Sequence, residues 1–569
     1  MTTTLTRAPE RVASPPTPAW GWRVWLSRRW VSLATLTASL SIVGAANAWN
    51  LQGWPGRVND DEGTYVAEAW AMIYPHHLSH YTYWYDHPPL GWALIAAYTW
   101  VTDGFHRDPS AVMVGRELMW LATLVSSALL YLLARRLRFR RVTAAAAVLL
   151  FGLSPLAIYY HRMVSLDNLA TMWTLAALAI AATPRRSLGA AFWGGACFAA
   201  AVLSKETIAI LLPAVVWMLW QHTDKRTRRW NMASFAVAFS LVVLAYPLFA
   251  ALRGELLPGR GHVSLAWALW WQLFGRASSG SLLDPHSGTF GLAHFWLSID
   301  PWLVLAGAAL VPAGLVIRRL RPLAFALLLQ IAIMIKGGYL PYFYVTAMLP
   351  FAALLITGVA DSLCNPITRI YRSHLRRGGT RVAAWLPRVG CVPAVAAALV
   401  FIIMAAPNWW NVLRQQAKID GDGSSLAATA WILRNVPKRD VVVVDDYMWP
   451  DLRLRGMNPL WLWKVNTDPW VTKHVLPHGY ASIDYVVLAP QAPSTLATLP
   501  ILKAALRHSR IVKTFGDGIT ARVVIKPRAG FRRGECLAQP PFEKPTATLP
   551  ECLLPSRITM PEAKRGSQA

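Results

Sequence analysis

The stretch that decides the fold is residues 59–92, NDDEGTYVAEAWAMIYPHHLSHYTYWYDHPPLGW. It lies between two long apolar runs, yet it is dense in carboxylates, imidazoles and tyrosines. It opens with three consecutive acids at positions 60–62, and it closes with Asp86 and His87 ahead of a Pro-Pro pair. We therefore interpret the rest of the chain as a scaffold that holds this polar loop at one face of a membrane.

The composition is that of a membrane protein. Of the 569 residues, 55% are hydrophobic and only 15% are charged, and the mean hydropathy is +0.34. Soluble chains of this length rarely reach such values, and the 29 tryptophans fit aromatic belts at the two bilayer surfaces. The net charge of +27 does not indicate nucleic-acid binding, because the basic residues form short clusters between apolar runs. Five cysteines are too few for a disulfide framework.

Eleven apolar runs are candidates for membrane-spanning helices, and the first follows a short basic segment at residues 23–29. Several of the others are short enough to merge with a neighbour or to be re-entrant. The runs lie near residues 31–50, 111–133, 142–160, 165–183, 187–204, 206–221, 231–252, 297–317, 321–336, 338–359 and 391–408. The sequence thus predicts an all-α polytopic membrane domain over residues 21–408, with outer loops at 51–110 and 253–295.

Basic residues occur in alternate loops, which predicts the orientation of the chain. The basic loops lie at residues 135–141, 185–186, 225–229, 318–321 and 369–388. By the positive-inside rule the N-terminus is inside, and the acid-rich loop and the C-terminal region are outside. Residues Ala46-Asn47-Ala48 resemble a signal-peptidase site, so the first run is either a retained helix or a cleaved signal. Both alternatives place the acid-rich loop outside.

The two ends of the chain differ from the apolar middle. Residues 1–20 are polar and contain proline, which predicts a disordered cytoplasmic segment. Residues 409–526 predict a small extracytoplasmic α/β domain, and residues 527–569 predict a flexible tail in which Cys536 and Cys552 could pair if exported. Within the α/β domain we expect a helix at 424–436 and strands at 441–444, 485–488 and 522–525.

The acids Asp60, Asp61 and Glu62 are the first candidates for chemistry. Adjacent carboxylates outside a membrane can bind a divalent cation, act as a general base, or merely solvate a loop. The third alternative is normally the better one, but these acids directly follow a span and precede an amphipathic segment at 66–73. They would therefore meet substrates at the membrane surface. At the far end of the loop, the prolines after His87 predict a rigid turn.

Further ionisable residues occur at or near the ends of predicted spans. Charges inside membranes are costly, so such residues are candidates for function, although snorkelling is a strong alternative for the first and last of them. They are Arg116, Arg162, Asp167, Lys205, Glu206 and Lys336. The predicted topology places these groups on the face that carries Asp61. A carboxylate to activate a hydroxyl and cations to bind a phosphate are what sugar transfer from a lipid phosphate requires.

The order of these motifs resembles that of the GT-C glycosyltransferases, in particular the protein O-mannosyltransferases and the lipid A aminoarabinose transferases. The similar segments are Asp61-Glu62-Gly63-Thr64-Tyr65, Asp86-His87-Pro88-Pro89-Leu90-Gly91, Gly115-Arg116, Ser154-Pro155 with Arg162 and Asp167, Ser204-Lys205-Glu206, and the run from Tyr339 to Pro350. The second motif of the family usually continues with lysine, where this chain has Trp92. The resemblance covers residues 20–408, and the C-terminal domain is not part of the mannosyltransferase pattern.

The resemblance implies a polyprenyl- or dolichyl-phosphate sugar donor, inversion at the anomeric carbon, and no nucleotide sugar. It implies that Asp61, or its neighbour Asp60, is the general base and that Glu62 orients the acceptor or the sugar. The implied phosphate-binding residues are Arg162, Lys205, Arg116 and His87, and the implied acceptor- or sugar-binding residues are Asp86, Asp167, Tyr65 and Glu206. No cofactor is required, although Asp86 could hold a divalent cation with His262, His286 or His294.

The sequence therefore predicts a glycosyltransferase that moves a sugar to an acceptor glycan, lipid or protein at the outer face of a bacterial cytoplasmic membrane. The bacterial assignment follows from the Ala- and Arg-rich composition and the lack of a eukaryote-type luminal domain. One alternative is a transporter or flippase for a lipid-linked glycan, which predicts charges buried mid-span and functional sites on both faces. Another is a non-enzymatic cell-wall assembly protein that binds glycan through residues after 408 and tolerates Asp61→Asn.

Overall fold

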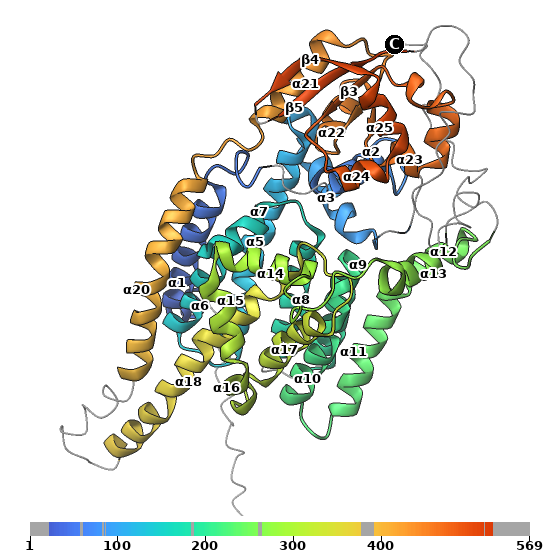
Figure 1. The fold of residues 1–569 in the computed structure, drawn as a ribbon. Helices are drawn as coiled ribbons and strands as arrows, with labels where there is room; N and C mark the ends of the chain where they lie inside the picture. Colours follow the sequence, from blue (N-terminus) through green and yellow to red (C-terminus); the bar gives the residue numbers. More distant parts are fainter. Residues whose placement is uncertain are drawn as a thin grey trace, which may run out of the picture.

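The protein consists of a helical bundle and a small α/β domain that lies on one end of it (Figure 1). The structure, a computed structural model, describes residues 22–56, 61–81, 85, 87–183, 187–259, 264–376, 392–516 and 518–526. The predicted site residues Asp60, Asp86 and His262 lie outside the described residues, as do Cys536 and Cys552.

Helices account for nearly all of the ordered structure before residue 417. They are α1 (Trp22–Ala48), α2 (Asp61–Ile73), α3 (Leu90–Val101), α4 (Gly104–Arg107), α5 (Ala111–Arg136), α6 (Arg141–Leu153), α7 (Pro155–Arg162), α8 (Leu166–Ala181), α9 (Leu188–Ser204), η1 (Glu206–Leu211), α10 (Leu212–His222), α11 (Arg228–Val243), α12 (Ala245–Leu252), α13 (Leu265–Trp270), η2 (Trp271–Gly275), α14 (Gly288–Ile299), α15 (Pro301–Ala309), α16 (Val311–Val316), α17 (Arg321–Lys336), η3 (Tyr344–Ala347), α18 (Leu349–Arg376) and α20 (Val392–Gln416).

The predicted helical membrane domain is confirmed, but the number of eleven spans is not. Among the described residues, four helices are long and apolar enough to cross a membrane, or six if each of two bent helix pairs counts as one span. The bends follow local sequence signals: Pro155 opens α7 after a 63° bend, and Pro301 opens α15 after a 113° bend. Helix α20 continues to Gln416, so the α/β domain begins later than the expected boundary at residue 408.

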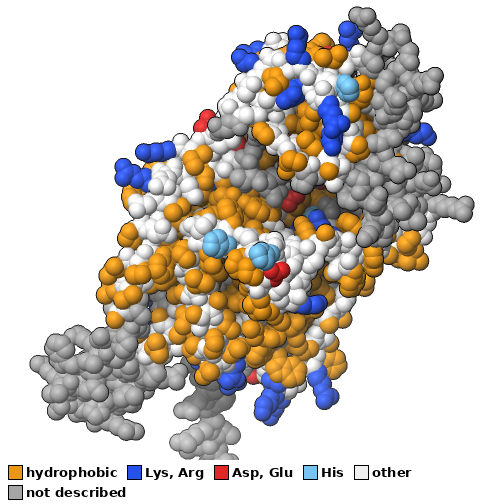
Figure 2. Space-filling view, in the orientation of Figure 1, with side chains coloured by type: hydrophobic (Ala, Val, Ile, Leu, Met, Phe, Trp, Pro, Cys, Tyr) orange, Lys and Arg blue, Asp and Glu red, His pale blue; other side chains and the backbone are white. Residues whose placement is uncertain are grey.

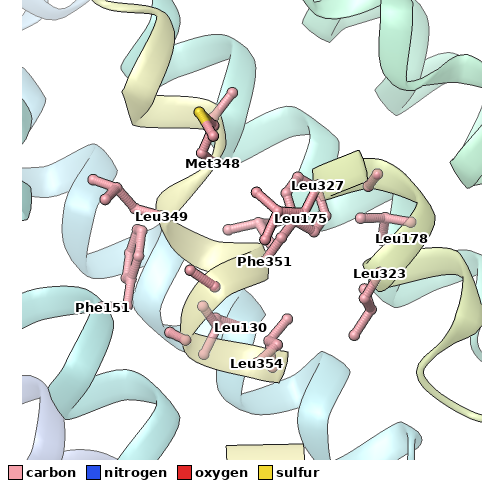
Figure 3. Packing of buried hydrophobic residues seen from close by; sticks show 14 of the residues in the cluster. Leu130, Phe151, Leu175, Leu178, Leu323, Leu327, Met348, Leu349, Phe351 and Leu354 are labelled. Carbon is pink, nitrogen blue, oxygen red and sulfur yellow. The ribbon is translucent and has the colours of Figure 1, made fainter. Parts of the chain in front are cut away.

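The core of the bundle is apolar and closely packed. In Figure 3, Phe351 and Leu354 of α18 lie among Leu130, Leu175 and Leu327, which come from three other helices. Helices α9 and α11 approach each other closely at a glycine, because a Cβ atom at Gly195 would lie 3.1 Å from the carbonyl carbon of Phe235. Close backbone approach at small residues is typical of helix pairs in membranes, where dispersion contacts replace the hydrophobic effect.

The end of the bundle away from the α/β domain is basic. Arg319 donates hydrogen bonds to the carbonyl groups of Leu137 and Arg138 and forms an ion pair with Asp361 at 2.6 Å. These contacts join two loops that carry predicted cytoplasmic charges to helix α18. Figure 2 shows a broad hydrophobic surface along the bundle, with blue basic side chains at its lower end. The orientation expected from the positive-inside rule stays a prediction.

The α/β domain contains a five-stranded sheet in the order β2-β1-β3-β5-β4. Its strands are β1 (Val441–Val444), β2 (Asn458–Trp461), β3 (Tyr485–Leu488), β4 (Ser509–Phe515) and β5 (Ile519–Val524). Strands β2, β1 and β3 are parallel, and β5 pairs antiparallel with both β3 and β4. The helices are α21 (Gly423–Asn435), α22 (Met448–Leu454), α23 (Lys464–Thr467), η5 (Val471–Val475), η6 (Gly479–Ser482), α24 (Pro493–Ala497) and α25 (Pro500–Arg507).

The sequence predicted part of this domain. Strands β1 and β3 have the expected bounds, α21 is within one residue of the expected helix, and β5 begins three residues earlier than expected. Strands β2 and β4 were missed. Strand β2 contains Pro459, which argues against a strand, and β4 is an edge strand whose side chains are mostly exposed and lack a buried alternation.

Candidate active site

The first motif, Asp61 to Tyr65, forms the first turns of α2. Its two described acids differ in environment. Asp61 begins the helix and is partly exposed, whereas Glu62 is completely buried. Acids in the first turn of a helix are favoured by the unpaired backbone N–H groups there. Tyr65 is also buried, and it lies four residues after Asp61, on the same side of the helix.

Glu62 is held by a fully buried ion pair with Arg116 of α5. The guanidinium donates through Nε and Nη2 to the two carboxylate oxygens, each at 3.0 Å, and neither side chain is exposed. The backbone N–H of Val164 donates to the same carboxylate at 2.8 Å, and the Tyr447 hydroxyl donates to it as well. Glu62 is thus engaged by Arg116, Val164 and Tyr447. Its predicted contact with acceptor or sugar stays a prediction.

Arg116 also connects the bundle to the α/β domain. Its Nη1 donates to Asp422 at 3.0 Å and to the carbonyl oxygen of Gln52 at 2.7 Å, and its Nη2 donates to the carbonyl oxygen of Gly56 at 3.1 Å. Asp422 lies in the segment between α20 and α21. The guanidinium therefore joins α5, the loop that precedes α2, and the α/β domain. These contacts favour a scaffold role for Arg116 over the predicted contact with phosphate.

Arg162 binds the C-terminal end of α1. Its guanidinium donates to the carbonyl oxygen of Asn47 at 2.9 Å and to that of Trp54 at 3.1 Å, and it also donates to the carbonyl of Trp49. The last carbonyl groups of a helix lack partners within the helix, and a cation is favoured there. The structure accordingly gives Arg162 a role at the end of the first span. Its predicted contact with the lipid phosphate stays a prediction.

Lys205, His87 and Glu206 form a hydrogen-bonded chain. The Lys205 ammonium lies 2.8 Å from Nε2 of His87, and Nδ1 of His87 lies 3.0 Å from the Glu206 carboxylate. An ammonium only donates, so Nε2 accepts and the neutral imidazole carries its proton on Nδ1, from which it donates to Glu206. Lys205 and His87 are both buried. The structure thus brings His87 beside Lys205 and Glu206, which lie more than a hundred positions later in the sequence.

Two more predicted residues border this chain. The Tyr65 ring centroid lies 6.1 Å from that of His87 and 6.0 Å from the Lys205 ammonium. Asp167, at the start of α8, interacts electrostatically with Lys205, Glu206 and His87. The predicted Tyr65, His87, Asp167, Lys205 and Glu206 therefore form one cluster beside the helix face that carries Asp61. We refer to these five residues as the lysine cluster.

Two supports of the lysine cluster were not predicted from the sequence. The Tyr246 hydroxyl of α12 donates to the carbonyl oxygen of His87 at 3.1 Å. Tyr85, which packs against Tyr246, donates from its hydroxyl to Glu255, which also accepts from Arg253 at 3.2 Å. Tyr246 lies within an apolar helix and carries no sequence signal. Glu255, an isolated acid just after a predicted span, could have been singled out on that ground.

The α/β domain contributes residues that the sequence analysis did not single out. The Asp446 carboxylate accepts from the backbone N–H of Thr64 at 3.0 Å and from its hydroxyl at 3.3 Å. Asp446 and Tyr447 lie two and three residues after the end of β1, at the carboxyl end of a parallel strand. Such positions frequently carry functional residues in α/β sheets, so the pair of acids after a predicted strand was an available signal.

Of the predicted metal ligands, His286 and His294 lie within the described part of the chain. His286 and His294 are both exposed, and Asp86 and His262 lie outside that part. The described residues contain no group of three or more His, Cys, Asp or Glu side chains that could hold a metal ion. The divalent cation stays a prediction.

The fold is similar to that of several solved structures. The apo structure of ArnT from Cupriavidus metallidurans is similar, with a TM-score of 0.51 and 16% identity over 89% of this chain and 98% of that chain. ArnT bound to undecaprenyl phosphate is also similar, with a TM-score of 0.49 and 16% identity over 92% and 100% of the two chains. An oligosaccharyltransferase from Archaeoglobus fulgidus gives a TM-score of 0.49 and 13% identity over 89% and 76%.

A family model described as dolichyl-phosphate-mannose-protein mannosyltransferase matches residues 86–249, which include most of the lysine cluster. No curated protein matches the sequence. The similarity in fold and the family match together confirm the predicted resemblance to the GT-C glycosyltransferases.

Proposed function

We propose that this protein transfers a sugar from a polyprenyl-phosphate donor to an acceptor hydroxyl at the outer face of a bacterial cytoplasmic membrane. The observation that carries the proposal is the position of the lysine cluster. A buried ammonium, an imidazole and two further carboxylates lie beside Tyr65, one helical turn after Asp61. This arrangement supports a role for Asp61 as the base for a hydroxyl and for Lys205 as the cation for a phosphate.

Asp61 is the proposed general base. Of the two described acids in the motif, Glu62 is completely buried and engaged by Arg116, whereas Asp61 is partly exposed at the start of α2. An acceptor can therefore reach Asp61 without dismantling a buried ion pair. Asp60 lies outside the described residues and is the alternative base.

Lys205 is the proposed phosphate-binding residue. A glycosyl phosphodiester carries one negative charge, and its phosphate gains a second as the bond to the sugar breaks. An ammonium in a buried site stabilises such a developing charge more strongly than it does in water. The hydrogen bond from His87 to Glu206 fixes the imidazole tautomer, so that Nε2 orients the ammonium. Asp167, Glu206 and Tyr65 are the proposed partners of sugar hydroxyl groups, with Asp86 as a further one.

The proposed reaction is a single displacement. Asp61 accepts the proton of the acceptor hydroxyl while the acceptor oxygen attacks the anomeric carbon from the side opposite the phosphate. The bond from the anomeric carbon to the phosphate oxygen breaks, and its electron pair stays on the phosphate. The products are an inverted glycoside and a polyprenyl phosphate. Binding of a lipid phosphate is supported by the matched family, whose description names dolichyl-phosphate-mannose.

The test is sugar transfer in membranes with a panel of polyprenyl-phosphate sugars. We expect wild type to consume one donor and Asp61→Asn to lose about 10²- to 10⁴-fold in rate, the usual contribution of a general base. Asp103→Asn is the matched control, because Asp103 is an exposed acid in a neighbouring loop and asparagine tolerates its left-handed backbone. The control should retain the wild-type rate.

The Asp60→Asn variant decides between the two candidate bases. If Asp60→Asn alone loses transfer, Asp60 is the general base instead of Asp61, and the proposed function is unchanged. No consumption of any donor, or wild-type function of both variants in a cellular assay, would overturn the proposal and favour the transporter.

A further inference from the structure

We propose that the α/β domain is part of the transfer machinery, in which Asp446 is a positioning residue that holds the N-terminus of α2 and thereby the carboxylate of Asp61. The inference rests on the proposed function, in that it takes Asp61 to be the base. The contact between the domain and α2 is independent of that function, and it can be tested without an activity assay.

The sheet topology explains why α2 is bound where it is. Strand β1 lies in the middle of the parallel part of the sheet, with β2 on one side and β3 on the other. In open α/β sheets the strand order reverses at such a strand, and a crevice at its carboxyl end is the usual ligand site. Here the residues that follow β1 contact α2. The catalytic helix thus occupies the position of a ligand.

Contact between the two backbones depends on Gly63. A Cβ atom at this position would lie 2.6 Å from the backbone nitrogen of Tyr447, and closer still to the carbonyl group of Asp446. Gly63 lies inside α2, where glycine costs about 1 kcal/mol relative to alanine. The glycine of the motif therefore allows the segment after β1 to contact the backbone of α2, and it lowers the stability of the helix. Any larger residue would push the domain and α2 apart.

Asp446 caps α2 from another domain. The first four N–H groups of a helix lack partners within the helix, and they are usually satisfied by a side chain that immediately precedes it. For Thr64 the acceptor is instead the carboxylate of Asp446, which is 1% exposed and 382 residues away in sequence. A carboxylate there also complements the positive end of the helix dipole. Losing Asp446 would remove both contributions at the turn that carries Asp61.

The domain also holds the later part of α2 and the loop after it. Trp449 of α22 packs edge-on against Trp70, with centroids 5.3 Å apart, and against His80, with centroids 4.6 Å apart. The backbone N–H of Trp461, the last residue of β2, donates to the Tyr81 hydroxyl at 2.7 Å. With Asp446 at its start and Trp449 near its end, α2 is fixed at two points. Rigid support of this kind preorganises a catalytic group.

The first experiment needs no substrate. Hydrogen exchange of the purified full-length protein is followed in peptides that cover α2, for wild type, Asp446→Ala and Asp446→Asn. We expect faster exchange in Asp446→Ala, because the Thr64 N–H loses its acceptor, and near wild-type exchange in Asp446→Asn, whose amide oxygen can still accept. The matched control is Asp484→Ala. Asp484 accepts from the backbone N–H of Val441 at 2.8 Å in the same domain, without contacting α2 in any described hydrogen bond.

The second experiment measures transfer by the same variants per folded molecule. A misplaced catalytic group costs about 10²-fold for a 1 Å shift, so we expect kcat of Asp446→Ala to fall by about tenfold to a hundredfold. The donor KM should change by less than about threefold, because the lysine cluster is intact. Asp446→Asn should recover most of the rate. Gly63→Ala should resemble Asp446→Ala in both measurements.

Unchanged α2 exchange in Asp446→Ala would overturn the inference, and so would wild-type kcat in that variant despite faster exchange. An equal loss of kcat in Asp484→Ala would also do so, because the effect would then be general instability of the domain. If wild type transfers no sugar at all, the proposed function fails, while the exchange result still decides whether Asp446 clamps α2.

Discussion

Glu62 and Arg116 form a bidentate ion pair in which neither side chain has any exposed surface. The pair lies directly beside Asp61, and Glu62 accepts additional hydrogen bonds from the Tyr447 hydroxyl of the α/β domain and from the backbone N–H of Val164. One acid of the motif therefore supports the fold, while its partly exposed neighbour faces the acceptor in our proposal. Substitutions of Glu62 should therefore affect stability, and substitutions of Asp61 should affect transfer.

Glu62→Ala should impair folding more than it impairs the chemistry of the folded fraction. Removing one partner of a buried ion pair typically costs about 3–5 kcal/mol, and Arg116 would keep Asp422 as its remaining described carboxylate partner. The matched control is Glu117→Ala, which removes the partner of Arg107 in a partly exposed pair and should cost about 0–1 kcal/mol. Thermal unfolding in detergent measures both. Equal stability of the two variants would contradict the structural role of Glu62.

Lys205→Met should reduce transfer by raising the barrier for departure of the phosphate. The ammonium is the cation of the lysine cluster, and a lost charge-assisted contact in a buried site typically costs about 2.7–4 kcal/mol, or roughly 10²- to 10³-fold in kcat. Lys336→Met is the control, because Lys336 is an exposed lysine at the end of α17. Steady-state kinetics with the consumed donor check the prediction. A wild-type kcat in Lys205→Met would remove Lys205 from the proposed site.

Stability should depend on pH through Asp451. Burial raises the pKa of this carboxyl from its usual 3.8 to about 7, although the N–H of Ala111 and the charge of Arg455 act in the opposite direction. The folded state then binds more protons than the unfolded state between about pH 4 and pH 7. The contribution of Asp451 to stability therefore falls as the pH rises through that window.

Asp451→Asn removes this titration and keeps an oxygen that can accept from Ala111. We expect the variant to resemble wild type at pH 5 and to have the higher Tm at pH 8. The measurement is thermal unfolding at both pH values, with Asp103→Asn as an exposed control. If the difference in Tm between wild type and Asp451→Asn is the same at both pH values, burial does not raise the pKa of Asp451.

Transfer should continue after divalent cations are removed. In our proposal the positive charge that stabilises the leaving phosphate comes from Lys205, so no step depends on a metal ion. The check is the initial rate after treatment with EDTA and after dialysis, compared with samples supplemented with Mg²⁺, Mn²⁺ or Zn²⁺. Complete loss of transfer with recovery on adding one metal would instead favour the alternative in which Asp86 binds a cation with a histidine from the outer loop.

Much of the architecture could be predicted because it depends on local pattern. Apolar runs indicated the helices of the bundle, and the valines at 441–444 indicated β1. The count of spans could not be predicted as reliably, because proline-initiated breaks such as the one at Pro155 divide an apolar run without changing its hydropathy. Strand β4 was missed because an edge strand needs only its neighbour's hydrogen bonds, and it shows no buried alternation.

The sequence by itself determined the class of fold and the candidate residues, since hydropathy, charge distribution and motif order can be read along the chain. Only the tertiary structure decided what those residues contact. The chain has 29 acids and 56 bases, and local sequence does not specify that Glu62 pairs with Arg116 or that Lys205 donates to His87. The link from Asp446 to α2 spans 382 positions. Such pairings follow from the packing of whole domains. A buried charge without a partner is costly, and only the folded chain brings its partner within hydrogen-bonding distance.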